Sequence, residues 1–123
     1  MQSLARSAYA GARTANLHAP RNAEYDLFAG ITARLRRHGG ADGSFPALAA
    51  ALDDNRRLWT TLIADVSDSG NALPRELRAR IAFLGRFTLA HTRQVLAGTA
   101  GPDILIEINT ALMRGLAGEE GTG

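Results

Sequence analysis

The fold of this chain is decided by residues 45–66, whose centre reads Leu52-Asp53-Asp54-Asn55-Arg56-Arg57-Leu58-Trp59 and contains the only tryptophan. On a helix the apolar residues of this segment recur every three or four positions and share one face, which also holds one polar residue. That face consists of Leu48, Leu52, Asn55, Trp59, Leu62 and Val66. Asp53 and Asp54 fall on the opposite side, each spaced for an ion pair with Arg57. The segment predicts a long amphipathic helix, opened by Ser44 as its N-cap.

Three more helices are predicted by the same spacing. One begins near Pro20, ends before Gly39-Gly40 and has an apolar face of Tyr25, Phe28, Ile31, Thr32 and Leu35. A second opens at Leu73-Pro74, with Asn71 as its candidate cap and a main stripe of Leu77, Ile81, Leu84, Thr88, His91 and Val95. The last opens at Pro102-Asp103 and buries Ile104, Leu105, Ile108, Leu112 and Leu116.

Four helices with short connections predict an all-α fold, a small antiparallel bundle of four main helices. Its length of 123 residues suits one domain. We expect the helical domain to cover residues 19–117 and the tail, residues 118–123, to be disordered. We expect the alanine-rich residues 1–18 to form an N-terminal arm or a short helix.

Composition excludes several classes of protein. The absence of cysteine rules out disulfides and thiolate metal sites. No apolar run reaches the roughly 20 residues of a membrane helix, so we expect no membrane insertion and, without a signal peptide, a cytoplasmic location. All 14 basic residues are arginine, but the net charge is only +2 and acids are interspersed. We therefore do not expect nucleic acid as a direct partner.

No catalytic or cofactor site is expected. The histidines His18, His38 and His91 are far apart, and none has a partner at metal-ligand spacing. Residues 39–43 contain glycines but lack the lysine and the preceding strand of a phosphate loop. We therefore predict that the protein is not an enzyme and uses no cofactor or metal.

Asn55 and Asn109 lie on or beside apolar stripes and need hydrogen-bond partners if they are buried. One interpretation joins them with His91 or Thr88 in a structural polar layer that fixes helix register. The other lets an amide bind the backbone of a peptide partner. We favour the structural layer of Asn55, His91 and Asn109, because buried amides are usually satisfied within the fold. Trp59 is likewise expected in the core rather than at a binding hot spot.

Three ordered motifs resemble the FlaF family of flagellar biosynthesis regulators. The first is Ala51-Leu52-Asp53-Asp54-Asn55-Arg56-Arg57-Leu58-Trp59, with Tyr25 and Phe28 upstream. The second is Leu73-Pro74-Arg75-Glu76-Leu77-Arg78-Ala79-Arg80-Ile81, followed by Phe87 and His91-Thr92. The third is Ile104-Leu105-Ile106-Glu107-Ile108-Asn109, followed by Met113-Arg114-Gly115-Leu116. The Ala8-Tyr9 pair matches the start of that family. The resemblance covers residues 19–116.

This resemblance implies a bacterial flagellum biogenesis factor that binds flagellin as a cytoplasmic chaperone and so regulates flagellin synthesis, secretion and assembly. The regulator FlbT is a further expected partner. The amphipathic termini of flagellin need cover before assembly, and surplus apolar helix surface could supply it. The expected partner-binding residues are Phe83, Phe87, Ala90, Ile106 and Met113. The N-terminal arm is a hypothetical movable cover for this surface.

A second hypothesis is post-transcriptional regulation of flagellin expression, through flagellin mRNA or through FlbT. Direct RNA binding would use arginines as phosphate contacts and would weaken steeply with salt. The candidates are Arg56, Arg57, Arg75, Arg78 and Arg80. The modest net charge and the lack of aromatics arranged for base stacking argue against it.

Overall fold

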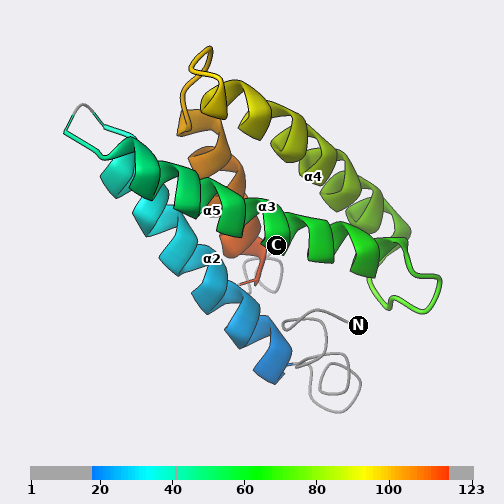
Figure 1. The fold of residues 1–123 in the computed structure, drawn as a ribbon. Coiled ribbons are helices and arrows are strands. Elements are labelled where there is room, and N and C mark those ends of the chain that lie inside the picture. The colour runs from blue at the N-terminus through cyan, green and yellow to red at the C-terminus, as the bar shows by residue number, and fades with distance from the viewer. Residues whose placement is uncertain (1–17, 41, 117–123) are drawn as a thin grey trace.

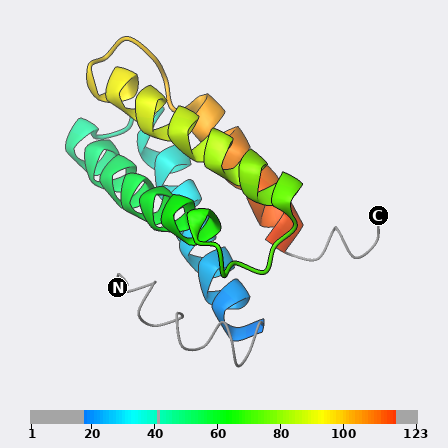
Figure 2. The ribbon, with the colours of Figure 1, turned by 90° about the vertical axis from the view of Figure 1, so that its right-hand side faces the viewer.

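The computed structural model describes residues 18–40 and 42–116, which form four α-helices and confirm the predicted all-α bundle. The helices are α2 (His18–His38), α3 (Phe45–Ser67), α4 (Arg75–Leu96) and α5 (Asp103–Leu116). Each runs antiparallel to the next through a short connection (Figures 1 and 2). None of these helices combines the length and apolar character needed to cross a membrane. The predicted arm, apart from His18, and the predicted tail lie outside the described residues.

Ser44 begins α3 as predicted. Its side-chain oxygen accepts a hydrogen bond from the Ala47 backbone N–H at 3.3 Å, which satisfies one donor at the free end of the helix. Pro46 occupies the first turn, where its missing N–H leaves no bond unmade. The start of the central helix is therefore fixed by two neighbouring residues of the sequence.

Asn71 does not cap α4, so that prediction is wrong. α4 follows Pro74 without a side-chain cap. The Asn71 side-chain oxygen instead accepts a bond from the Leu73 N–H at 2.9 Å, and its amide group donates to the Asp65 carbonyl at 3.0 Å. Asn71 stabilises the turn between α3 and α4 by bonding residues on both sides of itself.

The core surrounds Trp59 of α3, which is fully buried. Phe28 of α2 presents its ring edge-on to this indole, with centroids 5.6 Å apart and an interplanar angle of 75°. Leu35, Leu52 and Leu105 are also fully buried and bring α2, α3 and α5 together. The predicted faces of α2 and α3 match this core, except that Tyr25 is 37% exposed.

The buried face of α4 is rotated from the predicted stripe. It consists of Ile81, Gly85, Thr88, Thr92 and Val95. A Cβ atom on Gly85 would lie 2.6 Å from Ile63 Cγ1 and 3.1 Å from Trp59 Cε3, so the glycine lets the two backbones approach. Turning Gly85 toward α3 turns Leu77 outward, where it is 41% exposed. The prediction that Leu77 is buried is wrong for this reason.

α4 is attached to the bundle chiefly through α3. α3 packs against α2 and α4, and α2 packs against α5, but α4 and α5 touch each other little. The two helices diverge from the loop that joins them (Figure 1). Gly98 ends α4 with a φ of 81°, a left-handed conformation that suits glycine. One flank of α4, the side toward α5, is consequently left partly uncovered.

Candidate binding surface

A hydrogen-bonded network at the centre of the bundle joins α2, α3 and α5. The Trp59 indole N–H donates to Asn109 Oδ1 at 2.9 Å. The Asn109 amide donates to Asn55 Oδ1 at 2.9 Å and to Thr32 Oγ1 at 3.1 Å. All four side chains are at most 1% exposed. We call Thr32, Asn55, Trp59 and Asn109 the central polar network.

The chemistry of this network fixes the orientation of Asn109. An indole nitrogen can only donate, so the Asn109 oxygen must face Trp59 and both amide N–H groups must face the acceptors on α2 and α3. Because Asn55 and Asn109 are each 0% exposed, neither amide is open to a peptide from solvent. The structure therefore brings the two asparagines together in an internal network.

His91 and Thr88 do not join the central polar network. His91 Nε2 lies 3.0 Å from the Gly101 carbonyl, to which it must donate, and the ring stacks on Phe87 at 5.4 Å. The Thr88 carbonyl accepts a bond from the Thr92 hydroxyl at 2.6 Å. His91 thus fastens the end of α4 to the following loop. Within the described residues, no three His, Asp or Glu side chains are grouped to hold a metal ion.

The aromatic residues predicted to bind a partner lie outside the core on α4. Phe83 is 65% exposed and Phe87 is 40% exposed, and Ala90 is also exposed. They occupy the side of the helix away from the buried Gly85 and Thr92. These three residues form one continuous strip, because they are spaced by four and three positions.

Ile106 and Met113 lie on a different surface. Both are partly buried against the core. Ile106 lines an open hollow beside the end of α2, together with Leu35, Arg36 and Pro102. Met113 is two turns further along the same side of α5. The five predicted binding residues therefore do not form one groove, since α4 carries three of them on its outward side and α5 turns the other two toward α2.

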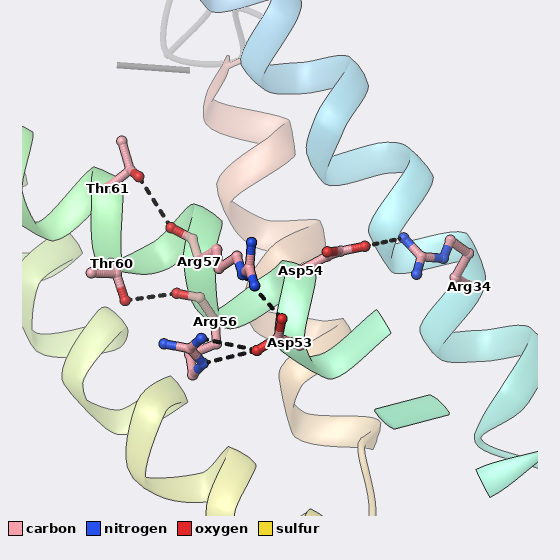
Figure 3. A network of polar contacts seen from close by, with 7 residues as sticks. All are labelled: Arg34, Asp53, Asp54, Arg56, Arg57, Thr60 and Thr61. Atoms are coloured by element: carbon pink, nitrogen blue, oxygen red, sulfur yellow. Dashed lines mark hydrogen bonds and ion pairs between the residues drawn. The ribbon is translucent and has the colours of Figure 1, made fainter. Parts of the chain in front are cut away.

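The charged residues of the central motif pair with one another on the surface of α3 (Figure 3). Asp53 binds Arg57 at 3.0 Å, as predicted, and also Arg56 at 2.9 Å. The predicted pair of Asp54 with Arg57 is wrong, because Asp54 binds Arg34 of α2 at 2.7 Å instead. Hydrogen bonding from Arg56, helped by the positive charges of both arginines, holds the pKa of Asp53 below its ordinary value.

α4 carries an excess of positive charge. Its arginines are Arg75, Arg78, Arg80, Arg86 and Arg93, against the single acid Glu76. The ion pairs described above lie on α2 and α3, and none of the ion pairs in residues 18–40 and 42–116 uses Arg80 or Arg86. Both of these arginines are exposed. The exposed aromatic strip therefore lies on the most basic helix of the bundle.

Leu77 also belongs to the exposed surface of α4, although its helical spacing predicts a place in the buried stripe. Leu77, Leu84 and Phe87 follow one another at helical intervals. Leu77 and Phe87 are exposed and Leu84 is only partly buried. The clue available in the sequence was the breadth of the apolar arc on this helix, which exceeds what one neighbouring helix covers.

A sequence model of one family, described as Flagellar protein FlaF, matches residues 5–116. The match includes all four helices and the motif Asn55, Arg56, Arg57, Leu58 and Trp59. No curated protein and no solved structure matches the chain significantly. The resemblance inferred from the sequence motifs is confirmed.

Proposed function

The chain belongs to the FlaF family of flagellar proteins, and on this premise we propose that it binds flagellin in the cytoplasm as a chaperone. In this role it keeps unassembled flagellin soluble before secretion. Its occupancy by flagellin also reports how much flagellin awaits export, which links it to the regulation of flagellin synthesis. The protein acts by binding and not by catalysis.

The observation that carries this proposal is the exposed aromatic strip on α4. Phe83 is 65% exposed, although burying a phenylalanine side chain is worth about 2 kcal/mol. Phe87, one helical turn away, is 40% exposed and extends the same strip. Contiguous exposed apolar side chains on a small protein are typical of a surface that binds another protein. An amphipathic helix of unassembled flagellin has an apolar face that suits it.

Direct binding of flagellin mRNA receives less support. Two of the arginines considered for phosphate contacts, Arg56 and Arg57, already bind the carboxylate of Asp53. A phosphate would have to compete with that carboxylate on the same helix. Arg80 and Arg86 of α4 take part in no ion pair among the described residues, but they flank Phe83, whose exposed ring favours an apolar ligand.

The test is calorimetric titration of the full chain with flagellin from the same cell, at low and at high salt. We expect a Kd of about 1 μM or tighter that weakens only modestly with salt, because salt screens the ion pairs at the edge of the site and leaves the apolar contacts intact. A parallel titration uses the leader segment of flagellin mRNA, for which phosphate contacts predict a steep loss of affinity with salt.

Failure of flagellin to bind, in a preparation that binds FlbT or the mRNA leader, would sink the chaperone proposal. Binding of FlbT alone would make the protein an adaptor. Salt-sensitive binding of the mRNA leader would make it a direct regulator of translation. Circular dichroism establishes in each case that the protein is folded.

A further inference from the structure

α4 has two apolar faces, and the bundle covers only one of them. The covered face contains Ile81, Gly85 and Thr88. The second face follows the spacing of an amphipathic helix through Leu77, Arg80, Leu84, Phe87 and His91, with Phe83 beside it. Leu77, Phe83 and Phe87 are 41%, 65% and 40% exposed. We call Leu77, Phe83, Leu84 and Phe87, with the arginines beside them, the open face of α4.

Among the described helices α4 has one close neighbour, which leaves the open face uncovered by them. In a closed antiparallel bundle each helix packs against two adjacent helices. Here α4 packs on α3 and touches α5 only slightly, and α5 packs mainly on α2. Leu84, which is partly buried at the edge of the core, marks where the covered face gives way to the open one. The position of a second neighbour is thus available to a helix from another molecule.

The charges on the open face indicate what that helix carries. Arg80 and Arg86 each lie three residues from Phe83, so they flank it on the helix surface. Neither takes part in an ion pair among the described residues. The only acid on α4, Glu76, lies in its first turn. A ligand with apolar residues facing Phe83 and acidic residues facing these arginines complements the surface in both respects.

Two other occupants suit this face less well. A second copy of the chain, paired face to face about a twofold axis, would bring Arg80 and Arg86 of both copies together. Single-stranded RNA would find arginines, but Leu77 and Leu84 add aliphatic area that neither stacks on bases nor binds phosphate.

We infer that the open face of α4 is the docking site for an acidic amphipathic helix of the client protein. The inference rests on the proposed function, which supplies the client, and it assigns the surface and the chemistry of the bound segment. The helix lies along α4 with its apolar face on Phe83 and Phe87. Its acidic residues bind Arg80 and Arg86.

Two synthetic amphipathic peptides test the chemistry of this site. They share the same apolar positions and differ only in carrying Glu or Lys at the flanking positions. We expect the Glu peptide to bind the full chain at least about tenfold more tightly, and the double variant Arg80→Glu/Arg86→Glu to reverse that preference. Arg37→Glu, a change at an exposed arginine of α2, is the matched control and should leave the preference intact. Equal binding of both peptides would overturn the inference.

Phenylalanine variants test the location of the site. Phe83→Ala should weaken binding of the Glu peptide by about tenfold or more, since few residues carry most of the energy of such an interface. Phe45→Ala is the matched control, because Phe45 is an equally accessible phenylalanine, 56% exposed, at the start of α3. Circular dichroism checks that both variants fold. Equal affinity of the two variants, or loss of binding only in Phe45→Ala, would place the site elsewhere.

Titration with flagellin separates this inference from the proposed function. If flagellin binds the wild-type chain and Phe83→Ala equally well, the chaperone proposal stands and the docking site falls. If the Glu peptide binds through Phe83 but flagellin does not bind at all, the docking site stands and the client is a different protein. Binding of single-stranded RNA through the same arginines, together with no binding of either peptide, would overturn the inference in favour of nucleic acid.

Discussion

The two sides of α3 are joined to their neighbours by different means. Toward α2 and α5, Trp59 and Asn55 of α3 enter the central polar network, in which each contact has a donor, an acceptor and a fixed direction. Toward α4, the contact depends on the missing side chain of Gly85, which lets Ile63 and Trp59 pack against the helix backbone. Hydrogen bonds fix the side of α3 that faces α2 and α5, and close packing against Gly85 fixes the side that faces α4.

A small bundle can therefore combine a fixed helix register with an uncovered helix face. Hydrogen bonds from Asn109 set the register of three helices, because shifting any of them leaves a buried polar group unpaired. Among the described helices α4 is held on one face only, and its second face is the docking site that we propose.

Removing the Asn109 amide should cause the largest loss of stability. Asn109→Ala leaves the Trp59 indole N–H and the Asn55 oxygen without their partner, and we expect a loss of about 3 kcal/mol in the free energy of unfolding. Urea unfolding followed by tryptophan fluorescence measures it. Gln94→Ala, which removes an exposed amide from α4, is the control and should cost less than about 0.5 kcal/mol. A loss below about 1 kcal/mol for Asn109→Ala would show that the network does not hold the bundle together.

The same substitution at two glycines should have opposite effects. Gly85→Ala forces a methyl group against Ile63 and should lower the free energy of unfolding by about 1 to 2 kcal/mol, despite the better helix propensity of alanine. Gly30→Ala, where no atom lies within 4 Å of the new Cβ, should raise it by about 0.5 to 1 kcal/mol. Thermal and urea unfolding of both variants provide the comparison. Equal effects would mean that α4 does not approach α3 at Gly85.

Truncating the open face should leave stability nearly unchanged. Phe83→Ala removes a side chain that is 65% exposed, so we expect a change within about 0.5 kcal/mol in the free energy of unfolding. Flagellin binding should nevertheless weaken markedly. A large loss of stability in this variant would assign Phe83 to the core and would remove the main support for a docking site there.

The smallest effect concerns pH. Because the pKa of Asp53 is lowered in the folded protein, its pairing with Arg56 contributes stability above the ordinary carboxyl pKa of about 4 and loses that contribution as the pH falls through the folded value. Asp53→Asn should therefore be slightly less stable than wild type at pH 7, and the difference should vanish in acid. Urea midpoints measured from pH 7 down to pH 3 test this, and a difference that persists in acid would contradict it.

The sequence predicted the parts of this fold that depend on periodicity within one helix. The face of α3, the polar positions Asn55 and Asn109 and the Ser44 cap follow from spacing and side-chain chemistry alone. The shared polar layer of the two asparagines was also predicted, but their bonds to Thr32 and Trp59 were not, because these depend on how the helices are placed against one another. The same limit explains why Asp54 was assigned to Arg57 and not to Arg34 of the neighbouring helix.

The rotation of α4 was mispredicted for a different physical reason. A search for apolar stripes gives weight to Leu77 and Leu84 and none to Gly85, yet the glycine lies against α3 because it has no side chain. Thr92 was also passed over, although its hydroxyl bonds the Thr88 carbonyl and so suits a buried site. The sequence did indicate that α4 is apolar over a wide arc, but which part of the arc is covered depends on the neighbouring helices.

The most direct test of the account is to map the surface that flagellin contacts, by the changes in backbone amide NMR signals of the chain on titration with flagellin. We expect changes concentrated in residues 77–91, around Phe83 and Phe87, with little change around the Arg34–Asp54 pair on the opposite part of the bundle. Changes confined to α2 and the outer surface of α3, with residues 77–91 unaffected, would contradict the assignment of the open face of α4 as the site that binds the client.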